Sequence, residues 1–221
     1  MEKSEVTSQK PGTVLVCFAL IEEADAFQKL AAGRDDVSIL ITGIGQQNAE
    51  TSFRRFLEGN SPRQVLTCGF AGGLNPDLKI GDVVFSTLQR TSWDALAKQG
   101  ARSVYFHCAN RIATTAAEKT ELRRKTRQDA VEMESGHIQQ LCRERKIPCT
   151  TVRVISDTAD ENMPFDFNKL SKPDSSLDFG KLAWAILKSP GKIPALLRLR
   201  KNTNLAAQRL AEVLANVIWP K

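Results

Sequence analysis

The chain of 221 residues contains few of the side chains that bind metals or cross-link a fold. Its two histidines, His107 and His137, belong to no metal-ligand spacing, which argues against a zinc site. The five cysteines are odd in number and form no CxxC pair, so buried free thiols fit the sequence better than disulfides. We therefore expect no metal, no other cofactor and a reducing, cytoplasmic location.

Long apolar runs are also missing from the sequence. No run approaches the roughly 18 residues of a transmembrane helix, and residues 1–12 lack the apolar stretch of a signal peptide. We expect residues 1–12 to be a disordered leader. Residues 13–221 are expected to form a single domain with a C-terminal helical extension from about residue 179.

The net charge of +6 is concentrated near the C-terminus. Residues 179–211 contain no Asp or Glu, whereas seven Lys or Arg residues fall there and the rest of the chain is close to neutral. A local excess of this kind does not indicate nucleic-acid binding, and we expect none. Residues 181–201 mix basic and apolar side chains, which fits either a peripheral membrane contact or a surface helix with its leucines on the core.

Short apolar runs alternate with helical patterns along most of the chain. Strands are predicted at residues 13–19, 37–42, 63–69, 82–87, 103–108, 129–133 and 149–155. Helices are predicted at residues 22–31, 46–57, 118–126, 135–145, 180–188, 193–201 and 204–218, and a glycine-rich loop at 71–76. The alternation predicts an α/β fold with a layered sheet.

Carboxylates follow three of the predicted strands, where ligands bind in α/β sheets. Glu22 and Glu23 fit either a general base or two solvated acids in a first helical turn. Glu134 fits either an acceptor for sugar hydroxyls or an acidic helix start capped by Ser135. Asp157 fits either a proton donor to a leaving group or a helix cap. The residues alone leave each pair of interpretations open.

The turn at residues 43–45 (GIG) resembles the opening of a dinucleotide-binding fingerprint. Asn48 occupies the position of the third glycine, so the fingerprint is incomplete and a dinucleotide site is not expected. The glycines would still allow the backbone to approach a sugar or a base closely.

Four blocks in sequence order resemble the purine nucleoside phosphorylase and nucleosidase superfamily, and in particular methylthioadenosine/S-adenosylhomocysteine nucleosidases. They are residues 19–23 (ALIEE), 42–45 (TGIG), 68–82 (CGFAGGLNPDLKIGD) and 130–160 (AVEMES…RVISDTAD). Residues 189–199 (SPGKIPALLRL) resemble the tail of hopanoid-associated nucleoside phosphorylase-like proteins. The resemblance implies a three-layer αβα sandwich with a mixed, twisted sheet, and an enzyme that cleaves the bond between adenine and ribose.

The resemblance also implies a role for each of the three carboxylates. Asp157 would be the general acid that protonates N7 of the purine. Glu134 would accept hydrogen bonds from the 2′ and 3′ hydroxyls, and its charge would favour an oxocarbenium-like transition state. Glu23 would orient and activate water. The implied substrate-binding residues are Met133, Ser156, Arg153, Gly69, Phe70, Ala71 and Gly72, with Met133 packed against the ribose.

The sequence departs from the nucleosidase pattern in two places. Phe70 stands where a serine is usual, and the segment before Ala130 is shorter and lacks the aromatic residue that covers adenine. Superfamily phosphorylases place an arginine where Thr67 stands, so we expect hydrolysis, with phosphorolysis as the weaker option.

Three further expectations concern substrate and assembly. The ligand is expected to be a 5′-substituted adenine nucleoside, and the alternative is an adenosyl-lipid such as a hopanoid precursor. A catalytically inactive nucleoside-binding protein is the competing class. The resemblance implies a homodimer.

Overall fold

The computed structural model of the chain describes residues 12–170, 172 and 178–220. The expected leader lies outside the described residues except for Gly12. The strands are β1 (Val14–Phe18), β2 (Val37–Ile41), β3 (Gln64–Gly73), β4 (Val83–Thr87), β5 (Arg102–Ser103), β6 (Phe106–Cys108), β7 (Ala130–Glu132) and β8 (Cys149–Asp157). The α-helices are α1 (Ile21–Ala31), α2 (Gln46–Leu57), α3 (Arg90–Lys98), α4 (Ala116–Thr126), α5 (Ser135–Glu144), α6 (Phe167–Leu170), α7 (Phe179–Lys188) and α8 (Ile193–Ile218).

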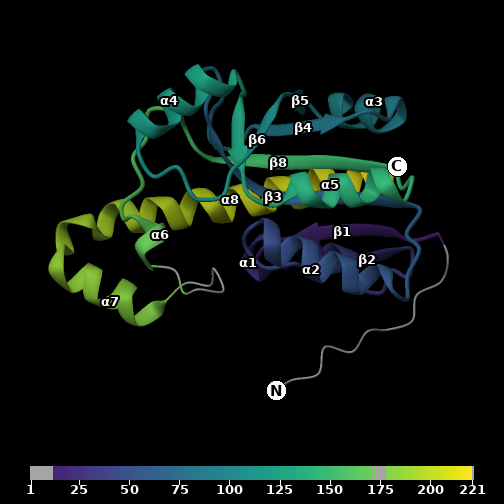
Figure 1. The fold of residues 1–221 in the computed structure, drawn as a ribbon, viewed down its shortest axis with the longest axis horizontal. Coiled ribbons are helices and arrows are strands. Elements are labelled where there is room, and N and C mark those ends of the chain that lie inside the picture. The colour runs from purple at the N-terminus through teal and green to yellow at the C-terminus, as the bar shows by residue number, and fades with distance from the viewer. Residues whose placement is uncertain (1–11, 171, 173–177, 221) are drawn as a thin grey trace.

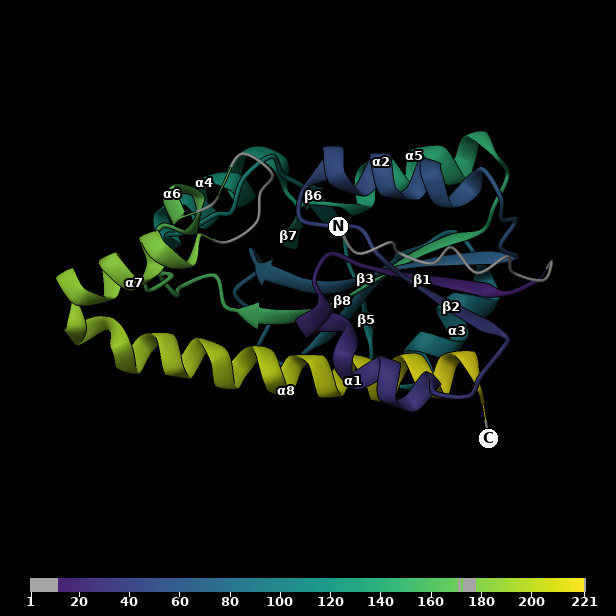
Figure 2. The same ribbon diagram turned by 90° about the horizontal axis from the view of Figure 1, so that it is seen from below.

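The strands form one mixed sheet in the order β2-β1-β3-β8-β4-β5, with β7 paired to β3 and β6 paired to β7 (Figure 1). Strands β2, β1, β3 and β8 run parallel, whereas β4 is antiparallel to β8 and β7 is antiparallel to β3. Helices α2 and α5 lie on one face of the sheet, and α1, α3 and α8 lie on the other (Figure 2). The predicted three-layer αβα arrangement with a mixed sheet is confirmed.

The alternating side chains of β1 explain why both faces need a helical layer. Val16 and Phe18 pack into the core shared with α1 and α8, and Leu15 and Cys17 pack into the core shared with α2 and α5. All five residues of the strand are buried. A strand that is apolar at every position cannot face water on either side, so helices cover both faces.

The glycine-rich segment is a strand where the sequence predicted a loop. β3 continues through Ala71, Gly72 and Gly73, because this stretch pairs with β8 on one side and with β7 on the other. The backbone of Asp157 lies 3.3 Å from where a side chain at Gly73 would begin. Glycine therefore lets neighbouring strands approach closely here and does not mark a turn.

Two other predictions about secondary structure were wrong. The helices predicted at 193–201 and 204–218 are one helix, α8, since the residues between them include neither proline nor glycine and fit a helix interior. The strand predicted at 103–108 is split into β5 and β6, which pair with β4 and β7 respectively. Helices α3 and α6 were not predicted.

The C-terminal helices divide into a packed part and a projecting part (Figures 1 and 2). The buried residues of α8 lie in its second half, under the sheet: Ala206, Ala207, Leu210, Ala211, Val213 and Leu214. The first half of α8 and the whole of α7 contain no buried residue and extend beyond the sheet. Among the described residues, no helix is both long and apolar enough to cross a bilayer.

Candidate active site

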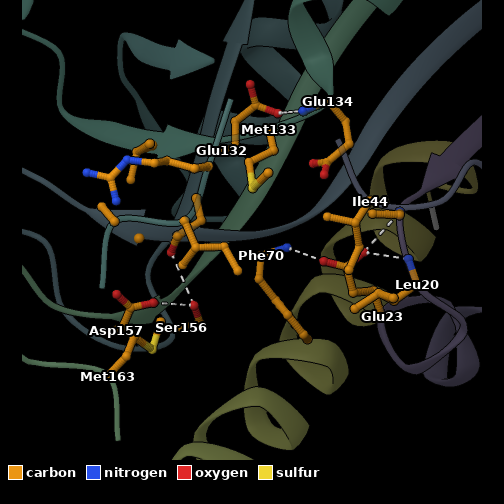
Figure 3. Close-up of a pocket in the computed structure, with 17 residues that line it drawn as sticks. Leu20, Glu23, Ile44, Phe70, Glu132, Met133, Glu134, Ser156, Asp157 and Met163 are labelled. Carbon is orange, nitrogen blue, oxygen red and sulfur yellow. Dashed lines mark hydrogen bonds between the residues drawn. The ribbon is translucent and has the colours of Figure 1, made fainter. Parts of the chain in front are cut away.

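A cavity of about 190 Å³ opens where β1, β3, β7 and β8 end, the expected place for a ligand in such a sheet. Most of the residues predicted for the site line it: Glu23, Phe70, Ala71, Gly72, Met133, Glu134, Ser156 and Asp157 (Figure 3). Gly69 and Arg153 do not line it but lie directly behind its wall. Residues from separate stretches of the sequence are thus brought together around one cavity.

Glu23 is held by backbone N–H groups at the start of α1. Its Oε2 accepts hydrogen bonds from the amides of Ala19 and Leu20 at 3.0 and 3.1 Å, and its Oε1 accepts one from the amide of Phe70 at 2.8 Å. Burial raises the pKa of Glu23, although Arg153 and these amides oppose the shift. Glu23 is therefore buried, whereas Glu22 is exposed. Of the two residues, Glu22 alone is the solvated acid of a first helical turn.

Arg153 is fully buried behind the cavity and connects the acidic residues to the sheet. Its Nη1 donates to the carbonyl of Cys68 at 2.8 Å, and its Nη2 lies 2.6 Å from Glu132 Oε2 and 3.4 Å from Glu134 Oε2. Gly69 makes this packing possible, since a Cβ there would lie 2.5 Å from Arg153 Nη1. The φ of Gly69 is +146°, which side chains rarely adopt.

Glu134 directly precedes α5 and lies on the same side of the cavity as Glu23, across from Asp157 (Figure 3). Its Oε1 accepts a hydrogen bond of 3.0 Å from the amide of Gly45, the N-cap of α2. The incomplete glycine fingerprint thus holds a carboxylate of the chain itself. Burial, opposed by Arg153 and reinforced by Glu132 and Glu23, raises the pKa of Glu134 to about 7. The carboxyl of Glu134 therefore changes its charge near neutral pH.

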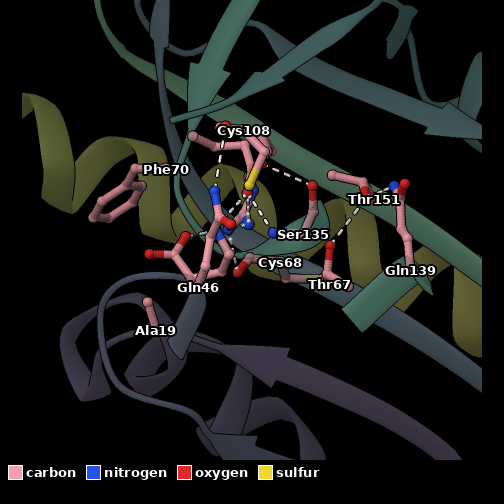
Figure 4. A network of polar contacts seen from close by, with 12 residues as sticks. Ala19, Gln46, Thr67, Cys68, Phe70, Cys108, Ser135, Gln139 and Thr151 are labelled. Atoms are coloured by element: carbon pink, nitrogen blue, oxygen red, sulfur yellow. Dashed lines mark hydrogen bonds and ion pairs between the residues drawn. The ribbon is translucent and has the colours of Figure 1, made fainter. Parts of the chain in front are cut away.

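Glu132 is a structural carboxylate that the sequence did not separate from Glu134. It accepts hydrogen bonds from the Glu134 amide at 3.0 Å, and from the amide and hydroxyl of Ser135 at 2.8 Å each. Burial alone would raise the pKa of Glu132, but Arg153 and these hydrogen-bond donors lower it by more. The pKa of Glu132 therefore lies below its usual value. Ser135 is therefore not the predicted cap of α5, and its hydroxyl belongs to the polar network drawn in Figure 4.

Asp157 ends β8 and is not a helix cap. Its Oδ1 accepts a hydrogen bond of 2.7 Å from the hydroxyl of Ser156, and its Oδ2 lies 2.5 Å from Nζ of Lys119. The contact with Lys119 is an ion pair rather than a well-directed hydrogen bond. Lys119 comes from α4 and was not singled out in the sequence, because lysine is common in a charged helix and nothing local marks it as buried.

Apolar side chains complete the cavity. Ile112 and Ala113 line it from the segment between β6 and α4, Met163 from the segment after β8, and Ile44 and Leu20 from the loops that follow the first two strands. Phe70 is the aromatic residue in the described lining. The short segment before Ala130 therefore contributes aliphatic groups where the nucleosidase pattern has an aromatic residue.

Thr67, the position at which the family resemblance implies an arginine in phosphorylases, is buried and is not part of the cavity lining. Its hydroxyl donates to Thr151 Oγ1 at 3.0 Å, and Gln139 donates to the same oxygen at 2.7 Å (Figure 4). This side of β3 is filled by neutral groups and does not offer a cation to the cavity.

The sequence model of the phosphorylase superfamily matches residues 21–88 and 88–188. The chain belongs to the phosphorylase superfamily. A relative named 5′-methylthioadenosine/S-adenosylhomocysteine nucleosidase, from Glaesserella parasuis serovar 5, is 29% identical over 61% of this chain and 73% of its own length. A relative named aminodeoxyfutalosine nucleosidase, from Campylobacter jejuni, is 27% identical over 57% of this chain and 69% of its own length.

Solved structures agree with the fold of this superfamily member. A futalosine hydrolase of Helicobacter pylori superposes with a TM-score of 0.70 at 16% identity, covering 94% of this chain and 97% of that chain. A methylthioadenosine/S-adenosylhomocysteine nucleosidase from Colwellia psychrerythraea, in complex with adenine, superposes with a TM-score of 0.70 at 18% identity, covering 95% and 96%. At these identities the likeness concerns the fold alone.

Proposed function

We propose that this superfamily member is an adenine-nucleoside N-ribosyl hydrolase, which releases adenine from an adenosine substituted at the 5′ carbon. The observation that carries the proposal is the placement of Glu23, Glu134 and Asp157 around a single cavity. Two relatives with nucleosidase names add support. A nucleoside-binding protein without activity would not need three carboxylates around one cavity, each held by its own set of hydrogen-bond donors.

Each carboxylate suits one part of the reaction. Cleavage of the C1′–N9 bond leaves positive charge on the ribose and negative charge on the purine, so a catalyst gains by stabilising both. Asp157 is the proposed donor of a proton to N7, and ionised Glu134 is the proposed partner of the ribose hydroxyls and of the developing cation. Glu23, held by three amides, is the proposed acceptor of a proton from the attacking water. Met133 would pack against the ribose.

Water suits the cavity as a nucleophile better than phosphate does. Phosphate capture needs cations or N–H donors aimed at the anion. The buried guanidinium of Arg153 is already paired with Glu132 and Glu134, and Thr67 offers no charge. Arg111 also lines the cavity, but its guanidinium is paired with Glu118 at 2.6 Å. The carboxylates in the lining would repel a phosphate dianion. We therefore propose hydrolysis with ribose, rather than ribose 1-phosphate, as the sugar product.

The test is adenine release from methylthioadenosine, S-adenosylhomocysteine and adenosine, with and without phosphate. Asp157→Asn should reduce adenine release by about 10²–10⁴-fold, because the amide cannot donate the carboxyl proton. Asp160→Asn is the matched control, since Asp160 lies three residues further on and is exposed. No release by the unmutated chain, or a strict need for phosphate, would contradict the proposal.

A lipid-bearing 5′ group is a second candidate, favoured by the position of α8. Its residues Ala195, Arg198 and Leu199 line a recess together with Asp157, and the projecting part of the C-terminal helices continues from there. That part exposes large apolar side chains: Phe179, Trp184, Leu187, Ile193 and Leu197. Binding to anionic vesicles, and turnover of an adenosyl-lipid in preference to methylthioadenosine, would favour this candidate and a peripheral membrane contact through 181–201.

The proposed assembly is a homodimer in the cytoplasm, as the family resemblance implies. Light scattering at assay concentration tests it, and a monomer that retains full activity would exclude any need for a second copy.

A further inference from the structure

Lys119 is a fully buried cation beside the proposed general acid. Its side chain is 0% exposed, and that of the carboxylate-paired Arg153 is 1% exposed. A buried lysine loses the hydration of its ammonium, so it persists as a charge only when its N–H groups find acceptors. Lys119 has two, the carbonyl of Thr158 at 2.6 Å and the carbonyl of Glu161 at 3.1 Å, and its ammonium also forms an ion pair with Asp157 Oδ2 at 2.5 Å.

Lys119 is held in place by the start of α4, which carries it, and by the turn after β8, which accepts its hydrogen bonds. A capping box starts α4, in which Thr115 accepts from the Glu118 amide and Glu118 accepts from the Thr115 amide, and Lys119 follows directly. The turn after β8 is closed by hydrogen bonds between Thr158 and Glu161 in both directions. The carbonyls that receive the ammonium are thus held as firmly as the helix that carries it.

The arrangement raises a chemical problem for the proposed reaction. An acid that protonates N7 must carry a proton, yet Oδ2 of Asp157 lies against the ammonium of Lys119, which is itself a proton donor. The ammonium of Lys119 is in contact with Asp157, and lysine, unlike arginine, can release a proton. Lys119 is therefore a candidate source of the proton that the reaction requires.

We propose that Lys119 is a positioning residue that stores the catalytic proton and passes it through Asp157 to the leaving base. This inference rests on the proposed function. An N–H bond of the Lys119 ammonium breaks as an O–H bond forms at Asp157 Oδ2. The carboxyl then gives its proton to N7, the electrons of the N9–C1′ bond go to the purine, and neutral adenine leaves.

The attacking water and its proton are handled on the other side of the cavity, at Glu23. Water adds to C1′ and its proton goes to the carboxylate of Glu23, leaving Lys119 as a neutral amine. The proton on Glu23 then returns through solvent to Lys119 when products leave. Charged groups near the pair, among the described residues, include Asp160 and Glu161 in the turn after β8, Arg198 of α8 across the recess, and Arg111 in the lining of the cavity. These residues stay the same in every variant below.

Two substitutions separate a proton store from a structural support. Lys119→Arg keeps the charge but cannot release a proton, so adenine release should fall by about 10²-fold or more at every pH. Lys119→Met removes the charge, so Asp157 must take its proton from solvent; activity should survive at acidic pH and fall by a similar factor as the pH rises. Lys125→Met, on the exposed face of the same helix, is the control.

A structural role predicts the reverse pattern. Lys119→Arg would then restore activity, and Lys119→Met would lower activity by the same factor at all pH values; either result overturns the proposal. If Lys119→Arg does not fold, the pH profile of Lys119→Met decides alone.

Infrared difference spectra, with the Asp157→Asn protein as the reference, report whether the Asp157 carboxyl is protonated. This measurement does not need turnover. The Lys119→Met protein should show a protonated carboxyl from Asp157 that the unmutated chain lacks. An ionised Asp157 in both proteins would refute the shared proton. If the unmutated chain releases no adenine from methylthioadenosine, the proposed function fails, and these spectra still decide the link between Lys119 and Asp157.

Discussion

Replacing Glu134 by Gln should make the protein more stable while making it less active. Glu134 is buried beside Glu132 and Glu23, and these surroundings raise its pKa from 4.5 to about 7. A carboxyl whose pKa is raised on folding stabilises the native state while it is protonated, and that contribution is lost as the pH rises through the folded pKa. Above neutral pH the native state therefore contains a charge that it holds less well than the unfolded chain does.

The size of the effect follows from the shift. Each pKa unit corresponds to about 1.4 kcal/mol, so ionised Glu134 costs on the order of 3 kcal/mol of unfolding free energy above pH 7. Glutamine removes the charge and keeps an oxygen that can accept from the Gly45 amide. The variant should match the unmutated protein below about pH 4.5, and its advantage should grow between about pH 5 and pH 8.

Urea unfolding at a series of pH values measures this difference, and adenine release measures the accompanying loss of activity. Activity should fall by about 10²–10³-fold, because the amide cannot stabilise a cationic ribose. The informative result is the pH dependence of the stability difference. Equal stability of the two proteins at about pH 8, or a constant offset at all pH values, would show that ionised Glu134 does not destabilise the native state.

Three further perturbations test other parts of the structure. Gly69→Ala should destabilise the protein by about 3 kcal/mol or more, because its Cβ would lie 2.5 Å from Arg153 and 2.6 Å from Glu23; thermal unfolding checks this against Gly59→Ala, whose site is open. Trp219→Ala should lower the unfolding free energy by about 2–3 kcal/mol and Trp219→Phe by less, since the indole stacks on Phe27 and donates to Asp36, which urea titration measures. Burial raises the pKa of the Cys17 and Cys68 thiols, so iodoacetamide should leave both unmodified in native protein at about pH 8 and label them after unfolding; rapid native labelling would contradict their burial.

The layered fold could be predicted because its signals are local. The apolar run of β1 and the helical pattern at 46–57 each indicate their secondary structure within a few residues. The structure places both elements close to the predicted bounds. The glycine-rich end of β3 could not be predicted in this way. Its extended structure depends on β7, more than 50 residues further along the chain, and on β8, so no local pattern distinguishes it from a loop.

The residues of the candidate site also differ in whether a local sequence pattern reveals them. Glu23, Glu134 and Asp157 stand beside strand ends, a position that the sequence pattern makes visible. Whether each is solvated or buried is a property of the assembled chain: Glu22 and Glu23 are neighbours, yet only Glu23 reaches the Phe70 amide. Lys119 carries no signal at all, because a lysine in a charged helix is ordinarily exposed and its burial depends on two carbonyls about 40 residues away.

The distribution of charge around the cavity links stability to the proposed chemistry. Three carboxylates, Glu23, Glu132 and Glu134, share one guanidinium, and the structure resolves the excess by keeping Glu132 ionised and raising the pKa of the other two. A buried carboxylate with a raised pKa gains more from a neighbouring cation than one that is already paired. In the proposed reaction, a ribose that becomes positive would supply that cation only at the transition state, so the repulsion among these carboxylates would favour bond cleavage over substrate binding.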